Sequence, residues 1–221
     1  GKRLQNNVRD LLLETFNQDS LALYNILVNL KKTKKAKLIY FSSSYVYSGH
    51  QSDISVNEKI SLSPKHSFGV AKLFFEKLII KEYNNSIIFR LSSVYGEGNY
   101  LHPNVIRIMA EEAINNRVIT LWGLGKRYMQ YIYIEDVIKY ILSSTTLSSG
   151  IYNLCNNNYL SVKETANIIA KFFDVNVKNI EQKPEGETLP FMDNQKIVNS
   201  LDTDLFSDHI ETLNNYLNIL K

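Results

Sequence analysis

The stretch SPKHSFGVAKLFFEKL, Ser63–Leu78, decides how the rest of this sequence is interpreted. Pro64 and Ser67 predict a helix start, and no proline interrupts the helix before Tyr83. Apolar residues at helical spacing predict one buried face, which contains Phe68, Ala71, Phe75, Leu78 and Ile79. Lys72 lies on this face one turn after Phe68. Lys72 therefore either forms an ion pair with Glu76, one turn later, or belongs to a functional site.

Two apolar stretches flank this helix, and each ends in consecutive serines. Leu38–Ser44 has no polar alternation, which predicts a central parallel strand buried on both faces. Ile87–Leu91 predicts the next buried strand. Because ligands bind beyond the carboxyl ends of the strands in a parallel sheet, we expect the serines at both ends to face one crevice. These serines are Ser42, Ser43, Ser44, Ser92 and Ser93.

The other segments predict an α/β protein. Helices are expected over Val8–Phe16 and Asp19–Lys32, the second capped by Asp19. The buried stripe of the second helix is expected to contain Leu23, Ile26, Leu27 and Leu30. From about residue 99 the elements become shorter, with helices over 105–116, 135–143 and 161–173 and strands over 118–122, 128–134 and 150–155. Ser161 and Glu164 predict a capping box.

The composition is that of an ordinary globular protein, with 44% hydrophobic and 21% charged residues among 221. A net charge of +3 gives no reason to expect nucleic acid or a membrane surface as a partner. No apolar run is long enough to predict a membrane span. Cys155 is the only cysteine, so no disulfide is expected and the cytoplasm is the expected location. The histidines at 50, 66, 102 and 209 have no metal-binding spacing, so no metal site is expected.

Three segments together resemble a known family. They are LIYFSSSYVYSG (38–49), the helix with F-G-V-A-K (68–72), and SIIFRLSSVYGEG (86–98). The sequence resembles the extended short-chain dehydrogenase/reductase family, the nicotinamide-dependent epimerases and dehydratases of nucleotide sugars. That family has SS-x-x-VYG, then Y-x-x-x-K on a helix, then R-x-x-x-VYGPG.

The resemblance implies an architecture in two parts. Residues 1–98 would be the C-terminal part of a doubly wound parallel, Rossmann-like sheet that binds NAD or NADP, and the strand and helix around 134–160 would join it. Residues 99–221 would form a smaller mixed α/β domain that binds a nucleotide-linked sugar. A homodimer is also implied, paired through the central helix at exposed apolar positions such as Phe74 or Leu78.

The resemblance also implies roles for individual residues. Ser43, counted back from Tyr47, falls on the catalytic position that polarises the reacting oxygen, whereas counting forward along the strand favours Ser44. Lys72 would hold the nicotinamide ribose and tune the acid/base at position 68. The implied cofactor-binding residues are Ser42, Lys72 and Ser92. The implied substrate-binding residues are Ser44, Ser93, Asn104 and Trp122, with Trp122 either against the nucleotide base or in the core. Arg127 is a further candidate for substrate binding, because it stands near a family arginine that is missing here.

The sequence departs from the family pattern at the catalytic tyrosine, which is Phe68 here. Phenylalanine has no proton to exchange, and general acid/base catalysis typically contributes ~10²–10⁴-fold. We therefore expect an epimerase, dehydratase or keto-reductase that is impaired by Phe68. The alternative is a catalytically inactive, family-derived binding or assembly protein.

Two further departures concern phosphate binding. No glycine-rich turn follows a strand to hold the cofactor pyrophosphate, which favours a fragment over a chain that has lost the cofactor. Two family arginines are also replaced, one by Met129 and one by Pro184. Arg127 and Lys183 stand near these positions and are candidate substitutes.

Overall fold

A computed structural model of the chain describes residues 2–33, 35–98 and 103–221, with side chains from residue 16 onward. The helices are α1 (Lys2–Thr33), α2 (Ser67–Glu82), α3 (Val105–Asn116), α4 (Ile134–Ser143), α5 (Val162–Phe173), α6 (Gln195–Leu201) and α7 (His209–Leu220), with a 3₁₀ turn η1 (Ser44–Tyr47). The strands are β1 (Leu38–Ser43), β2 (Ser55–Val56), β3 (Ser86–Leu91), β4 (Ser93–Tyr95), β5 (Val118–Trp122), β6 (Tyr128–Met129), β7 (Tyr131–Tyr133), β8 (Gly150–Leu154), β9 (Leu160–Ser161), β10 (Asn176–Ile180) and β11 (Phe191–Met192).

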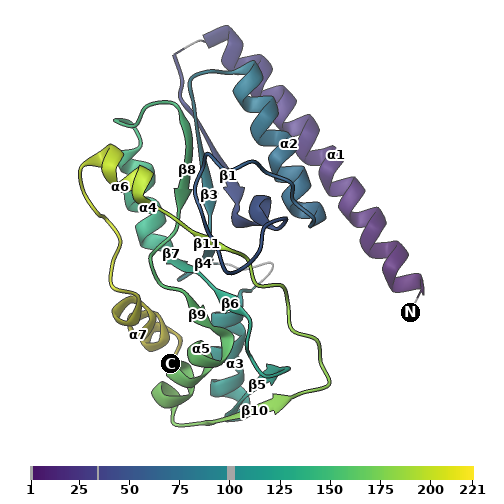
Figure 1. Ribbon diagram of the computed structural model, residues 1–221, viewed down its shortest axis with the longest axis vertical. Helices are drawn as coiled ribbons and strands as arrows, with labels where there is room; N and C mark the ends of the chain where they lie inside the picture. The colour runs from purple at the N-terminus through teal and green to yellow at the C-terminus, as the bar shows by residue number, and fades with distance from the viewer. Residues whose placement is uncertain (1, 34, 99–102) are drawn as a thin grey trace.

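The main sheet contains three parallel strands in the order β1-β3-β8, with helices on both faces (Figure 1). Because successive residues of a strand point to opposite faces, central β3 supplies two cores. Ile88 packs with residues of α1 and α2, whereas Ile87 and Phe89 pack with residues of α4 and α6. The α/β architecture with parallel strands predicted from the sequence is thus confirmed.

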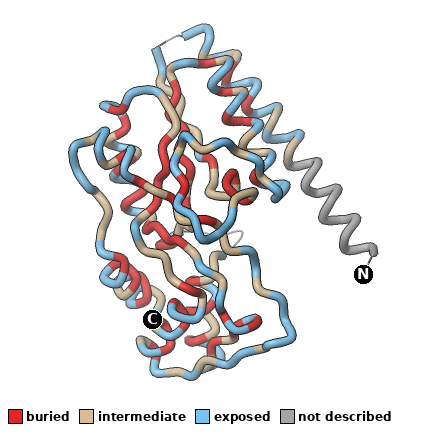
Figure 2. The backbone as a smooth tube through the Cα atoms, in the orientation of Figure 1, coloured by how far each residue is buried: buried red, intermediate tan, exposed pale blue. Residues whose placement is uncertain are grey.

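A second core lies at the other end of the molecule. Helices α3, α5 and α7 pack with β5 and β7 around Ile106, Ile119, Ile169, Tyr131 and Leu217. Strand β10 pairs with β5 in parallel. The short strand β4 follows β3 in the chain and pairs in parallel with β7. Figure 2 shows the buried positions following the main strands and the inner faces of the helices. The candidate site described below lies between the main sheet and this second core.

The structure corrects two expectations for the N-terminal part. The expected helices over Val8–Phe16 and Asp19–Lys32 are one helix, α1, and Asp19 lies in its interior instead of at a cap. The sequence of α1 contains no glycine or proline that would end a helix there. Of the predicted stripe, Leu23 and Leu27 are buried, while Ile26 is exposed.

Strand β1 is also less buried than predicted. It is an edge strand of the sheet formed by the described residues, and Phe41 is 40% exposed. Strand β3, predicted to be buried, is buried along most of its length. The capping box of α5 at Ser161 and Glu164 is confirmed.

Two properties of the described residues bear on function. No helix among them is long and apolar enough to cross a membrane. They also contain no group of three or more His, Cys, Asp or Glu side chains placed to hold a metal ion. His102 lies outside the described residues.

Candidate functional site

Helix α2 lies very close to the turn that follows β1, and a glycine makes this possible. A Cβ at Gly69 would stand 2.1 Å from the carbonyl oxygen of Tyr45, so a larger side chain would force the helix away. Helix α2 begins at Ser67 after His66, whose Nδ1 accepts the Phe68 N–H at 3.2 Å. The first turn of α2 therefore holds position 68 against the end of β1.

The inner face of α2 carries a buried ion pair. Arg90 on β3 donates to both carboxylate oxygens of Glu76, at 3.0 Å and 2.7 Å, and both side chains are almost fully buried. The Ser42 hydroxyl donates to the same carboxylate at 2.5 Å. Arg90 also donates to the Tyr47 hydroxyl, and burial raises the pKa of Tyr47 to about 12, which keeps this phenol neutral. Glu76 therefore pairs with Arg90, and the alternative pairing of Glu76 with Lys72 is wrong.

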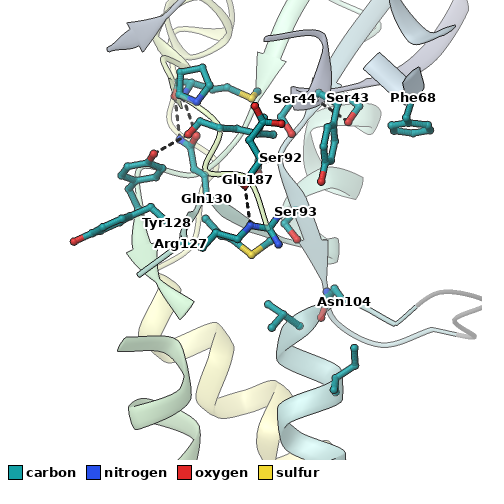
Figure 3. Close-up of a pocket in the computed structure, with 18 of the residues that line it drawn as sticks. Ser43, Ser44, Phe68, Ser92, Ser93, Asn104, Arg127, Tyr128, Gln130 and Glu187 are labelled. Atoms are coloured by element: carbon teal, nitrogen blue, oxygen red, sulfur yellow. Dashed lines mark hydrogen bonds between the residues drawn. The ribbon is translucent and has the colours of Figure 1, made fainter. Parts of the chain in front are cut away.

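A cavity of about 680 Å³ lies at the carboxyl ends of β1 and β3 (Figure 3). Its walls come from η1, the start of α2, β4, the start of α3, β6 and the segment 187–192. Seven of the predicted site residues line it: Ser43, Ser44, Phe68, Ser92, Ser93, Asn104 and Arg127. Ser42, Lys72 and Trp122 are not part of this lining.

The serines at the strand ends differ in their hydrogen bonds. The Ser43 hydroxyl oxygen accepts the Tyr45 N–H at 3.3 Å, which leaves its own proton available to a ligand. Ser92 is only 7% exposed, and its hydroxyl has no hydrogen-bond partner among the described residues. Since burying a polar group without a partner is unfavourable and Ser92 is a lining residue of the cavity, a ligand group that reaches this buried hydroxyl would supply its missing partner.

Lys72 lies beside the cavity, next to Phe68. Its Nζ donates to the Phe41 carbonyl at 3.0 Å and lies 5.5 Å from the centre of the Phe68 ring. Burial lowers the pKa of Lys72, against the opposing influence of Asp19 and Glu76. Phe68 is 43% exposed, so its ring belongs to the cavity wall and not to the buried face predicted for it.

The opposite wall contains Asn104 and Arg127. Asn104 caps α3, accepting the Arg107 N–H at 3.0 Å, and its amide also donates to the Val94 carbonyl. Its side chain is thus engaged within the chain, while the amino end of α3 faces the cavity, as anion sites at helix starts do. Arg127 donates from Nε to the Glu187 carbonyl at 2.9 Å (Figure 3).

Trp122 lines a second, smaller cavity of about 320 Å³. Arg127 lines both cavities and therefore stands between them. The Trp122 ring is 54% exposed, and Lys183 Nζ lies 4.4 Å from its centre. The alternative that Trp122 is a core residue is wrong.

Sequence reasoning missed several residues of the larger cavity. Tyr45 follows the triple serine directly, and that adjacency was the one available signal. Gln130 holds the cavity wall together, because its amide donates to the carbonyls of Asn156 and Met192 and accepts the Met192 N–H. Glu187 also lines the cavity, but it lies in a segment without helix or strand, so the spacing of apolar residues could not predict its position.

With this geometry in view, the chain can be placed among known proteins. Residues 9–155 match the NAD dependent epimerase/dehydratase family, and the chain belongs to that family. The suspected resemblance to the extended short-chain dehydrogenases/reductases is thereby confirmed. Its members are NAD-dependent enzymes of sugar nucleotides.

Two curated proteins show the likeness at the level of sequence. A protein of Methanocaldococcus jannaschii named "Putative UDP-glucose 4-epimerase" is 29% identical over 175 residues, covering 76% of this chain and 57% of the relative. The dTDP-D-glucose 4,6-dehydratase of Dictyostelium discoideum is 28% identical over 135 residues, covering 53% of this chain and 30% of the relative. The chain thus spans about half or less of these relatives.

Solved structures show the shared fold. The dTDP-glucose 4,6-dehydratase of Bacillus anthracis, in complex with NAD, has a TM-score of 0.79 at 18% identity, covering 89% of this chain and 65% of that chain. The ADP-L-glycero-D-manno-heptose-6-epimerase of Helicobacter pylori has a TM-score of 0.76 at 23% identity, covering 89% and 64%.

Proposed function

We propose that this protein modifies a nucleotide-linked sugar by NAD(P)-dependent oxidation and reduction, as an epimerase, dehydratase or keto-reductase. The observation that carries the proposal is the cavity at the strand ends, where Ser43, Phe68, Ser92 and Arg127 converge. Membership of the epimerase/dehydratase family supports the same reaction class.

The residues present fit the nicotinamide end of such a cofactor. Ser92 offers a buried hydroxyl without a partner, and Lys72 lies beside the same strand end. A bound NAD or NADP would supply the hydride acceptor. No glycine-rich turn that follows a strand occurs in the sequence, so these residues account for one half of the cofactor only.

Different residues of the chain then bind and polarise the substrate. Ser43 donates its proton to the reacting sugar oxygen and polarises it. The amino end of α3 and Arg127 bind the diphosphate, and Ser93 lies in the wall between them and Ser43. Trp122, on the far side of Arg127, packs against the nucleotide base with Lys183 beside it.

Binding can be measured directly, because Trp122 is the only tryptophan of these 221 residues and its signal in the full-length protein is assigned by its loss in Trp122→Phe. Titrating the full-length protein with UDP-, dTDP- and ADP-linked sugars is expected to change Trp122 fluorescence in a saturable manner. Arg127→Met should weaken this binding, whereas Lys171→Met, which removes an exposed cation on α5, should not. Absence of saturable binding for every nucleotide sugar would refute the proposal.

The second candidate is a binding or assembly protein without catalysis, and Phe68 is the observation that favours it. The two differ in cofactor binding and turnover. An enzyme should bind NAD(H) or NADP(H) saturably, and Phe68→Tyr should increase its turnover with little change in nucleotide-sugar affinity. A non-enzymatic protein should bind no nicotinamide cofactor, and Phe68→Tyr should leave it inactive.

We also propose a homodimer through α2. Phe74 is exposed on this helix beside Phe16 of α1, and Val70 and Ile80 are exposed apolar residues of the same helix. The expectation that Leu78 is exposed is wrong, because it is half-buried against the core between α1 and α2. Such residues are typical of a helix that pairs with a second copy. Monomeric behaviour in sedimentation experiments would remove this proposal.

A further inference from the structure

The cavity lacks a proton donor at position 68 but contains another phenol close by. Tyr45 lines the same cavity as Ser43 and Phe68. Its ring meets the Phe68 ring edge-on, with centroids 6.0 Å apart and planes at 81°. A tyrosine thus stands directly beside the position where the family's tyrosine is missing.

The backbone holds Tyr45 in place from two sides. Its N–H donates to Ser43 Oγ, the predicted polarising group, so the two residues are fixed relative to one another. The close approach at Gly69 presses α2 against the Tyr45 carbonyl. The Tyr45 ring also packs on His66, with centroids 4.6 Å apart. These contacts give Tyr45 the pre-organisation that proton transfer requires.

The other tyrosines near the site are less suited to this role. The Tyr47 hydroxyl is buried between Arg90 and Asn153. Tyr128 and Tyr159 stack on each other, 5.2 Å apart, and the Tyr159 hydroxyl donates to the Leu189 carbonyl at 2.7 Å. No hydrogen bond among the described residues engages the hydroxyl of Tyr45 or of Tyr128, so both are available to a substrate, but only Tyr45 is bonded to Ser43 and packs on Phe68.

We propose that Tyr45 is the catalytic acid/base of this protein and takes over the role that Phe68 cannot perform; this inference rests on the proposed function. In the oxidative direction Tyr45 acts as the phenolate, after its own proton has passed to solvent; the sugar O–H bond then breaks and its proton passes to the Tyr45 oxygen, which becomes a phenol again. The carbon that bears the hydroxyl becomes a carbonyl, and its hydride passes to the nicotinamide that the proposed function requires. In the reductive direction Tyr45 returns the proton to the carbonyl oxygen as the hydride returns to carbon.

The test compares Tyr45→Phe, which keeps the ring, with Tyr24→Phe, which alters an exposed tyrosine on α1 outside the cavity. In the full-length protein, Tyr45→Phe should lower kcat by at least about 100-fold and leave nucleotide-sugar affinity nearly unchanged. Tyr24→Phe should change neither quantity. Adding Phe68→Tyr to Tyr45→Phe should restore turnover, because a phenol returns to the cavity.

A second measurement does not depend on activity. In NMR spectra of isotope-labelled tyrosine, the Tyr45 signal, assigned by its loss in Tyr45→Phe, should shift when UDP-linked sugar binds. Wild-type turnover that survives Tyr45→Phe, an inactive wild type, or an unmoved Tyr45 signal would each overturn the proposal. If the wild type is active and Trp122 fluorescence reports nucleotide-sugar binding, the proposed function stands and only the role of Tyr45 fails. A wild type that binds nucleotide sugar but shows no turnover would instead favour the non-enzymatic candidate.

Discussion

Helix α2 borders two polar regions that differ in how their hydrogen bonds are satisfied. On its inner face, the Glu76 carboxylate accepts hydrogen bonds from both Arg90 and Ser42, with almost no solvent contact. At its amino end, the cavity is lined by Ser92, whose buried hydroxyl has no hydrogen-bond partner among the described residues, and by Tyr45, whose phenol makes no hydrogen bond to them. The first region stabilises the fold, and the second has hydrogen-bonding capacity left for a ligand.

Lack of a partner does not by itself mark a ligand site. His209 Nε2 also has no hydrogen-bond partner among the described residues, yet His209 begins α7 and is buried against the aromatic rings of Tyr95 and Tyr131. Burial lowers the pKa of His209 to about 4, so its imidazole is neutral near pH 7. His209 does not line the cavity, and unmet polar groups therefore indicate function only where a ligand can reach them.

The largest expected effect comes from the inner region. Glu76→Gln keeps the side-chain volume but leaves the buried Arg90 charge unpaired, which should lower the free energy of unfolding by ~3–5 kcal/mol. Chemical denaturation of the full-length protein measures this loss. The matched control is Glu111→Gln, which removes the exposed pair with Arg107 and should cost about 0.5 kcal/mol. Similar losses in the two variants would contradict the distinction drawn between buried and exposed pairs.

The sequence predicted the helices near the site better than the contacts that their side chains make. Helix α2 ends at Glu82, just before Tyr83, and α3 spans Val105–Asn116, as their apolar spacing predicted. Local spacing reports on helices because their hydrogen bonds are local. The pairing of Glu76 with Arg90 joins two elements across the fold, and no local pattern distinguishes it from the pairing with Lys72.

The triple serine at 42–44 also shows that a local sequence pattern predicts an element better than the contacts of its side chains. Successive residues of β1 point to opposite faces, so Ser42 reaches Glu76 while Ser43 reaches the cavity. Ser44 already belongs to η1 and also lines the cavity. The sequence predicted hydroxyls at a strand end, but the face of each depends on where the strand stops and the turn begins.

The next effect tests this division between the serines. Ser42→Ala removes a buried partner of Glu76 and should lower the free energy of unfolding by ~1–3 kcal/mol. Ser43→Ala removes only a long hydrogen bond from Tyr45 N–H and should cost less than about 1 kcal/mol. Denaturation curves measure both changes, and kcat should fall in Ser43→Ala because the reacting oxygen loses its donor. The reverse order of stabilities would place Ser42 outside the structural cluster.

The smallest effect on stability is expected at Ser92, and its sign is informative. Ser92→Ala removes a buried hydroxyl that has no partner in the free protein, so the free energy of unfolding should stay unchanged or rise slightly. If that hydroxyl bonds the nicotinamide end of a cofactor, NADH or NADPH affinity should fall by about tenfold, the equivalent of one hydrogen bond. Calorimetric titration measures the affinity, and Ser149→Ala, in an exposed loop, is the control. A clear loss of stability in Ser92→Ala would mean that the hydroxyl already makes a hydrogen bond within the protein. Ser92 would then stabilise the fold, as Glu76, Arg90 and Ser42 do.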